Sequence, residues 1–194
     1  MTRFGYPVSL DVGGKRAVVV GDARGKADAL RAAGAEVSEI SLREFGPKAL
    51  DGAFVCVASS GDPAEREAIF RACRERGVLV NVMDDPVRCD FAAPAVVRRG
   101  DLTIAVSTSG RSPALARRLR EELERRFGPE WAEILDVVGN VRDETNAELP
   151  DLGTRIERWQ DALDLDELEE LVRDGRSDEA RELLRGRLLG LVAR

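Results

Sequence analysis

The sequence offers carboxylates rather than imidazoles for chemistry, because its 194 residues include no histidine. This absence excludes Ser-His-Asp and Cys-His nucleophile pairs, histidine-ligated zinc and imidazole acid-base catalysis. The best acid-base candidates are two adjacent carboxylates, Asp84 and Asp85, after a predicted strand. Asp85 precedes Pro86, a turn signal that favours a structural role. Asp84 directly follows the strand, at the crevice where open α/β sheets bind ligands.

A second candidate site is the turn Gly21-Asp22-Ala23-Arg24-Gly25, which follows the first predicted strand. A dinucleotide-binding turn has the pattern G-x-G-x-x-G, because glycines let backbone N–H groups and a helix N-terminus approach a pyrophosphate. Here only the first and last glycines remain, so cofactor binding and a tight structural turn are both open. Glu39 lies where a ribose-binding acid is expected, about 20 residues on, and equally fits a solvated strand position.

A third candidate is the hydroxyl-rich loop Ser107-Thr108-Ser109-Gly110-Arg111-Ser112-Pro113, which leads into a predicted helix. Its N–H, O–H and guanidinium groups are donors suited to an anion. An ordinary capped helix start explains the last two residues equally well. Eight arginines between residues 98 and 126 give this region a local basic excess, although the whole chain has a net charge of -6. That acidic balance argues against nucleic acid as a partner.

The elements that must position these groups alternate between β-branched runs and helical patterns. Strands are predicted at residues 16–21, 35–41, 53–58 and 78–83, with helices at 26–33 and 63–76 between them. This βαβ rhythm predicts an α/β fold with a Rossmann-like parallel sheet and right-handed crossovers. Two further strands, 95–100 and 102–107, are predicted to meet at a Gly100-Asp101 turn.

The second half of the sequence is helical. Helices are predicted at 113–127 and 130–146, and two or three short ones between 154 and 193. Their leucine stripes suggest a dimer interface, with folding back onto the chain's own sheet as the alternative. We therefore predict a Rossmann-like NAD-binding domain at 1–100, a dimerisation region of a strand plus helices at 101–148, and a small C-terminal helical domain at 149–194.

The cysteines and the apolar runs indicate the compartment. Cys56, Cys73 and Cys89 are odd in number and form no C-x-x-C pair, which argues against a disulfide framework and for buried thiols in a reducing environment. The chain begins with no leader-like apolar run, and no stretch reaches the roughly 18 apolar residues of a membrane span. We expect a soluble cytoplasmic protein with no membrane partner.

Several motifs, most of them within residues 81–121, resemble a known family. They are Asn81-Val82-Met83-Asp84, the pattern F-x-x-P at residues 91–94, the run from Ser107 to Arg120, and the opening Tyr6-Pro7-Val8-Ser9-Leu10-Asp11. In these motifs the chain resembles the precorrin-2 dehydrogenase and sirohydrochlorin ferrochelatase family, the N-terminal module of siroheme synthase. The resemblance extends over the whole chain.

The resemblance implies NAD-dependent dehydrogenation of precorrin-2 to sirohydrochlorin, followed in some members by insertion of Fe²⁺ to give siroheme. It places the functional aspartate on Asp84, since hydride loss and metal insertion both require a base to remove protons. The substrate is an octacarboxylate, which suits guanidinium groups. The serine that some members phosphorylate falls on Thr108, and a homodimer is implied.

The site residues follow from the resemblance and the strand-end positions together. Those expected to bind NAD are Gly21, Asp22, Ala23, Glu39, Ser41, Leu42, Ala58, Ser59 and Asn81. Those expected to bind the tetrapyrrole are Ser107, Thr108, Ser109, Gly110, Arg111 and Arg117. No residue is assigned to a resident metal.

The chain departs from the family pattern on the cofactor side. The turn after the first strand is shortened, the stretch 41–52 is short, and the usual A-T-D-D reads Ala58-Ser59-Ser60-Gly61-Asp62. Two alternatives therefore stand beside the dehydrogenase: a metal chelatase without NAD-dependent activity, and a non-catalytic tetrapyrrole-binding regulatory protein. NAD binding separates the first alternative from the dehydrogenase.

Overall fold

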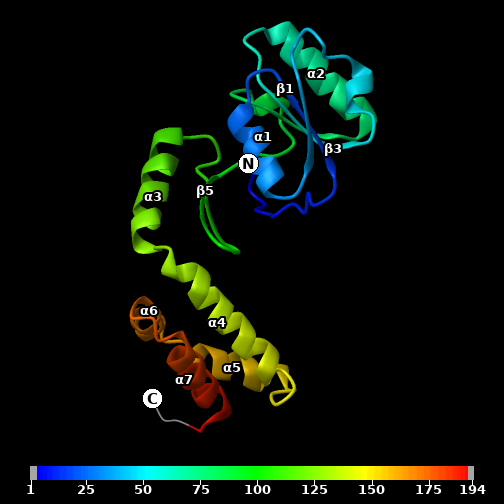
Figure 1. The fold of residues 1–194 in the computed structure, drawn as a ribbon. Coiled ribbons are helices and arrows are strands. Elements are labelled where there is room, and N and C mark those ends of the chain that lie inside the picture. Colours follow the sequence, from blue (N-terminus) through cyan, green and yellow to red (C-terminus); the bar gives the residue numbers. More distant parts are fainter. Residues whose placement is uncertain (1–3, 192–194) are drawn as a thin grey trace. The chain divides into compact units, whose positions relative to one another are not determined.

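The computed structural model describes residues 4–191 and divides into two compact units (Figure 1). The first unit contains the chain up to Ala93 together with Ser109–Arg111. The second contains Pro94–Thr108 and the chain from Ser112 onward. Each unit has its own buried core.

The first unit is built on a four-stranded parallel sheet of strand order β2-β1-β3-β4. Its strands are β1 (Arg16–Val20), β2 (Glu36–Ile40), β3 (Ala53–Ala58) and β4 (Leu79–Val82). The predicted Rossmann-like parallel sheet is confirmed. Because β2 and β3 flank β1 on opposite sides, the connections diverge there, and the carboxyl ends of β1 and β3 form a topological switch point.

Two helices, α1 (Arg24–Ala32) and α2 (Pro63–Arg76), connect the strands, with a short 3₁₀ turn η1 (Pro47–Leu50) before β3. The sequence predicted α1 to start at Lys26, which is two residues late. The helix starts earlier because the carbonyl of Ala23 already accepts the N–H groups of Lys26 (2.8 Å) and Ala27 (3.2 Å). Helix α2 has the predicted bounds, because the Asp62 carboxylate caps it by accepting the N–H of Ala64 (2.8 Å).

Both faces of the sheet are buried along β1 and β3, which explains why these two strands are continuous apolar runs. Along β1, Val18 and Val20 belong to the core that α2 covers, whereas Val19 packs with residues of α1. Cys56 on β3 and Cys73 on α2 are fully buried in the first of these cores. Their mutual hydrogen bond and their burial raise the pKa of the Cys56 thiol. All three cysteines are free and buried, as expected.

The described part of the second unit, which ends at residue 191, consists of a hairpin and five helices. The hairpin is a separate two-stranded antiparallel sheet, in which β5 (Ala95–Arg99) and β6 (Leu102–Val106) meet at Gly100 with φ 54°. The boundary predicted at residue 100 falls in this turn. The helices are α3 (Pro113–Arg126), α4 (Glu130–Thr145), α5 (Leu152–Ala162), α6 (Leu165–Arg173) and α7 (Ser177–Leu189). Between residues 4 and 191 no helix is long and apolar enough to cross a membrane.

Candidate functional site

The loops that carry the candidate residues of the first unit meet at the carboxyl edge of its sheet. Main-chain hydrogen bonds continue the ladder just beyond the strands: Gly21 N–H to the Ile40 carbonyl (2.9 Å), Ser59 N–H to the Val20 carbonyl (2.9 Å) and Met83 N–H to the Ala58 carbonyl (2.8 Å). The turn after β1, the segment after β3 and the turn after β4 are therefore neighbours. This edge unites most of the residues predicted to bind NAD with Asp84.

Gly21 opens the turn after β1 in a conformation that favours glycine, with φ 77°. A Cβ at this position would lie 2.2 Å from the Ser59 carbonyl oxygen, so the turn and the end of β3 approach as closely as the backbone allows. Ala23, the N-cap of α1, provides no side-chain hydrogen bond to the helix start. The first turn of α1 therefore keeps the kind of uncapped N–H groups that bind a pyrophosphate.

The turn fits NAD through its backbone, although one glycine of the usual pattern is replaced by Ala23. That alanine is 4% exposed and packs against Val19 and Ala27, so its methyl group belongs to the core. Asp22 is exposed, and a Cβ added to Gly25 would meet no atom within 4 Å. The edge of the turn is open where a pyrophosphate would lie.

Glu39 and Ser41, which were predicted to bind NAD, have partners inside the protein. The Glu39 carboxylate accepts a hydrogen bond from Arg31 on α1. The Ser41 hydroxyl donates to the Glu44 carboxylate (2.7 Å), and these Ser41 hydrogen bonds lower the pKa of Glu44. Leu42 lies beside Gly21, with its Cγ 3.5 Å from the Cβ position of that residue.

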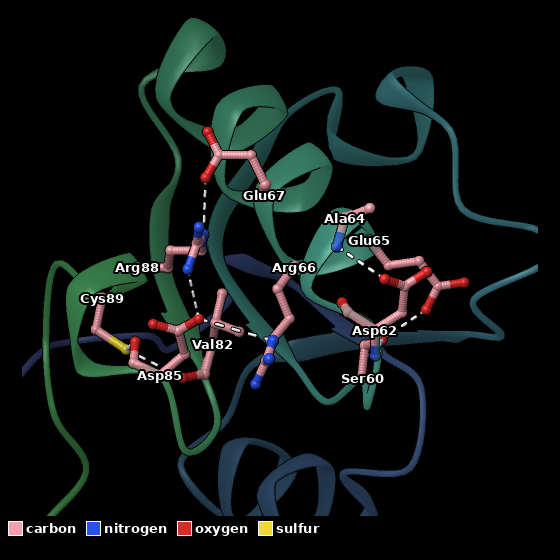
Figure 2. Close-up of polar contacts among 10 residues, drawn as sticks. All are labelled: Ser60, Asp62, Ala64, Glu65, Arg66, Glu67, Val82, Asp85, Arg88 and Cys89. Carbon is pink, nitrogen blue, oxygen red and sulfur yellow. Dashed lines mark hydrogen bonds and ion pairs between the residues drawn. The ribbon is translucent and has the colours of Figure 1, made fainter.

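Asp84 follows β4 in the left-handed region with φ 60°, and it is exposed. Aspartate is one of the few residues that tolerate this conformation. Its neighbour Asp85 has a side chain only 11% exposed, which accepts a hydrogen bond from Arg88 (2.7 Å) and forms an ion pair with Arg66 (3.7 Å; Figure 2). These contacts agree with the structural role predicted for Asp85 and leave Asp84 facing solvent.

The loop beyond Asp85 is hydrogen-bonded to β4 and to the turn that follows it. The Cys89 Sγ lies 3.2 Å from the carbonyl oxygens of both Val82 and Asp85, as Figure 2 shows. The Asn81 amide donates to the carbonyl of Phe91 (2.8 Å). Asn81 was predicted to bind the cofactor, and in the structure its amide holds the end of this loop.

Sequence reasoning did not find the ion pairs that join this loop to α2. Arg88 on the loop donates to Glu67 on α2 (2.8 Å) as well as to Asp85. Arg66, which precedes Glu67 on the helix, forms the ion pair with Asp85 (Figure 2). Hydrogen bonds from Arg88 and Arg71 lower the pKa of Glu67. Only the spacing between Asp85 and Arg88 was a signal in the sequence, since the partners on α2 become visible only in the fold.

The hydroxyl-rich loop is closed by its own residues. The Thr108 hydroxyl donates to the Ser112 carbonyl (3.1 Å) and accepts the Ser112 N–H (3.2 Å). The Ser112 hydroxyl caps α3 by accepting the Leu115 N–H (3.2 Å), so the predicted capped helix start is confirmed. Ser109 and Gly110 both have positive φ, 52° and 79°, and Ser107, Gly110 and Arg111 are exposed.

The predicted basic excess is reduced along α3 by glutamates one turn further on. Ion pairs join Arg117 to Glu121 (3.2 Å), Arg118 to Glu122 (3.3 Å) and Arg120 to Glu124. Arg117 remains 78% exposed, so its guanidinium is still accessible to an anion. Among the described residues there is no group of three or more cysteine, aspartate or glutamate side chains that could hold a metal ion.

Comparisons with known proteins agree with this arrangement. A family model described as NAD(P)-binding matches residues 8–95, and a model described as "Sirohaem biosynthesis protein central" matches residues 99–126. Siroheme synthase 1 of Pectobacterium atrosepticum is 32% identical over 176 residues, which cover 79% of this chain and 37% of that protein. Siroheme synthase of Psychrobacter sp. is 33% identical over 144 residues, which cover 74% of this chain and 29% of that protein.

The chain spans about a third of the length of these siroheme synthases. A solved structure titled "SirC, precorrin-2 dehydrogenase" matches with a TM-score of 0.59 and 21% identity, covering 94% of this chain and 98% of that one. At that identity the match establishes the fold. The two family models, in this order along one chain, confirm the resemblance seen in the motifs. Over these residues the chain is therefore homologous to the siroheme synthases, which is the resemblance that its motifs indicate.

Proposed function

We propose that this protein catalyses the NAD-dependent dehydrogenation of precorrin-2 to sirohydrochlorin in siroheme biosynthesis. The observation that carries the proposal is the position of Asp84, an exposed carboxylate at the same sheet edge as the uncapped start of α1. That combination suits a reaction in which a cofactor takes a hydride and a side chain takes a proton. The names of the siroheme synthases and of SirC support the choice of substrate.

The proposed NAD site uses the backbone of the turn Gly21-Asp22-Ala23 around the pyrophosphate. Other residues at this edge would line the rest of the cofactor: Glu39, Ser41, Leu42, Ala58, Ser59 and Asn81. The chemistry that NAD supplies when bound is hydride acceptance. Because Glu39 and Ser41 are hydrogen-bonded to Arg31 and Glu44, a contact with the ribose requires their carboxylate and hydroxyl to share or exchange partners.

The proposed role of Asp84 is that of general base. Its exposed carboxylate can reach a bound tetrapyrrole, and its left-handed backbone holds it out from the end of β4. The tetrapyrrole carboxylates would be bound by donors of the hydroxyl-rich loop and by α3: Ser107, Thr108, Ser109, Gly110, Arg111 and Arg117. Guanidinium and hydroxyl donors match an octacarboxylate.

Insertion of Fe²⁺ into sirohydrochlorin is the second candidate, with the metal ion as substrate. Asp84 favours it, because an exposed carboxylate can also accept the pyrrole N–H protons that a metal displaces. The protein would then combine oxidoreductase and lyase activities. A chelatase without NAD-dependent activity, or a tetrapyrrole-binding regulator, remains the alternative that NAD titration distinguishes.

We also propose a cytoplasmic homodimer in which residues 101–148 form the dimerisation region, residues 1–100 the NAD-binding domain and residues 149–194 a small helical domain. Helix α3 supports the dimer, because Leu115 and Leu119 lie one turn apart and are 50% and 38% exposed. A contiguous apolar patch on a surface marks an interaction site, and these two leucines would form part of one. Light scattering, which measures the molar mass in solution, tests the proposed dimer.

The test is an anaerobic assay of precorrin-2 with and without NAD, followed by addition of Fe²⁺ and read by absorbance. We expect NAD-dependent turnover that Asp84→Asn lowers by about 100-fold or more, as loss of a general base predicts. Asp166→Asn is the control, since it removes a carboxylate on α6 that is 94% exposed. Absence of NAD binding at millimolar concentration would refute the dehydrogenase, and unchanged turnover in Asp84→Asn would refute the assigned base.

A further inference from the structure

Arg66 is an arginine at the carboxyl edge of the sheet that has no role in the proposed reaction so far. It is the fourth residue of α2, the helix that follows β3. Its Nε lies 3.7 Å from Oδ2 of Asp85, whose own N–H donates to the carbonyl of Val82 at the end of β4 (3.1 Å). The guanidinium group of Arg66 therefore lies beside the turn after β4.

This guanidinium group lacks the hydrogen bonds that a partly buried arginine normally makes. The Arg66 side chain is 23% exposed, and its Nε is buried without a hydrogen-bond partner. The separation of 3.7 Å from Asp85 is too long for a hydrogen bond, and within residues 4–191 Arg66 has no other polar side-chain contact. A buried donor without a hydrogen bond costs free energy, so contacts inside the protein do not explain why Arg66 is placed here.

Asp85 does not depend on Arg66 for a partner. Arg88 donates to the same Asp85 oxygen at 2.7 Å and to Glu67 at 2.8 Å. Glu67 also accepts a hydrogen bond from Arg71 at 2.6 Å. This ion-paired cluster therefore contains three guanidinium groups and two carboxylates. The guanidinium group with the longest contact in it, and the one without a hydrogen bond to either carboxylate, is that of Arg66.

The terminal nitrogens of Arg66 are donors that no described residue uses. In Figure 2 the dashed line from Asp85 ends at the Nε of Arg66, and the two terminal nitrogens extend beyond it, away from Arg88. Because Nε is buried, the exposed part of the side chain lies at other atoms. The paired N–H donors at the end of a guanidinium group match the two oxygens of a carboxylate, and they also bind phosphate.

We propose that Arg66 binds a carboxylate of the tetrapyrrole substrate through its two terminal nitrogens. The inference rests on the proposed function and adds a substrate-binding residue on α2. The strand order favours the substrate over NAD as the source of the anion. The proposed pyrophosphate site is at the turn after β1, and the proposed ribose contact is Glu39 on β2. Arg66 instead contacts the turn after β4, which β3 separates from β1.

The test is a pair of titrations of the full chain, one with uroporphyrin, a stable porphyrin with eight carboxylates, followed by absorbance, and one with NAD, followed by calorimetry. We expect Arg66→Gln to weaken uroporphyrin binding by about 10- to 100-fold, because it removes hydrogen bonds to a charged group, and to change NAD affinity less than about twofold.

Arg74→Gln is the matched control, because it removes the same charge from the same helix. Arg74 pairs with Asp90 (2.8 Å), and its side chain is 62% exposed. As for other exposed ion pairs, its loss should change neither affinity by more than about twofold.

Three results would overturn the proposal. Unchanged binding of both ligands in Arg66→Gln would show that Arg66 contacts neither of them. NAD binding weakened as much as uroporphyrin binding, or more, would assign the guanidinium group to a phosphate of the cofactor or to the fold. Equal weakening of uroporphyrin binding in Arg66→Gln and Arg74→Gln would reduce the effect to net charge.

A second variant covers the case in which Arg66→Gln does not fold. Arg66→Lys keeps the positive charge beside Asp85 and removes the paired donors, so it should still weaken uroporphyrin binding. An affinity equal to that of the wild type in Arg66→Lys would overturn the proposal.

Turnover of precorrin-2 separates this inference from the proposed function. In an active protein, Arg66→Gln should raise KM by about 10-fold or more and change kcat less, because the contact is made in the bound substrate as well as in the transition state. A wild-type protein that binds uroporphyrin without turning over precorrin-2 would refute the dehydrogenase, and the titrations would still decide the role of Arg66. A wild-type protein that does not bind uroporphyrin would overturn the inference, whatever its turnover.

Discussion

The loops after β1 and β4 lie at the same sheet edge and are built in different ways. The turn at Gly21 is fixed by main-chain hydrogen bonds, a positive φ and a close approach to Ser59, and no side chain caps the helix that follows. The loop at Asp84 is fixed by ion pairs and by Cys89. Backbone fixation suits a site that binds a cofactor through N–H groups, whereas side-chain fixation suits one that must aim a carboxylate.

The largest effect is expected from Gly21→Ala, which tests the backbone fixation of the turn after β1. The new Cβ would require a shift of the Ser59 carbonyl and a strained positive φ, so the free energy of unfolding should fall by about 2–5 kcal/mol. Urea denaturation followed by circular dichroism measures the change. A loss below about 0.5 kcal/mol, the ordinary scatter of surface substitutions, would show that the turn is not fixed as described.

On the Asp84 side the comparable change is Cys89→Ala. It removes a thiol that is in contact with two carbonyl oxygens, in a residue only 8% exposed, so we expect a loss of about 1 kcal/mol. Cys89→Ser, which keeps a donor, should lose less. Equal losses in the two variants in the same urea experiment would mean that the Sγ contacts do not hold the loop.

Gly25→Ala should raise the free energy of unfolding, whereas the two substitutions above lower it. Gly25 lies in the first turn of α1 without a positive φ, and its added Cβ meets no atom within 4 Å, so the substitution should stabilise the protein by about 0.5–1 kcal/mol. If the pyrophosphate of NAD lies against this turn, the same methyl group weakens NAD binding. Calorimetric titration of NAD measures the second effect. If the variant is more stable and binds NAD with unchanged affinity, the pyrophosphate does not lie against Gly25.

The smallest expected effect depends on pH and comes from Glu67, which binds Arg88 of the loop after β4, and from Glu44, which follows β2. Glu67 and Glu44 both have a pKa below the usual range, Glu67 through Arg88 and Glu44 through Ser41. Each therefore contributes stability above its unfolded-state pKa, and that contribution is lost as the pH falls through the lower folded-state pKa. Thermal melts between pH 6 and about pH 3 should fall less steeply in Glu67→Gln and Glu44→Gln than in the wild type. Parallel curves would contradict these hydrogen bonds.

The parts of the fold that follow local rules could be predicted from the sequence. Buried parallel strands are continuous apolar runs, and helix α2 has its Asp-Pro start and its terminal Gly77, so these elements were found nearly to the residue. The start of α1 was missed because Ala23 caps it through its carbonyl alone. The hairpin β5-β6 was found, but its separation from the parallel sheet depends on long-range pairing that local patterns do not encode.

For the candidate site, the sequence favoured a structural role for Asp85 and placed Asp84 at the strand end, facing the crevice. Pro86 indicated a turn at Asp85, and direct succession to the strand singled out Asp84. What could not be predicted is the set of partners, because Arg66 and Glu67 lie on a helix far from Asp85 in the sequence. The hydrogen bonds of Glu39 with Arg31 and of Ser41 with Glu44 were also missed, although these partners are only eight and three residues apart in the sequence.

The buried thiols of the first unit can report when its structure opens, because they react only once they are exposed. Cys56 and Cys73 are fully buried and Cys89 is nearly so, and hydrogen bonding with Cys73 together with burial disfavours the Cys56 thiolate. A thiol reagent therefore reacts only when the surrounding structure opens, and all three cysteines belong to the first unit. Alkylation kinetics resolved by peptide mass would time the release of the Asp84 loop at Cys89 separately from exposure of the sheet core, with no probe introduced into the protein.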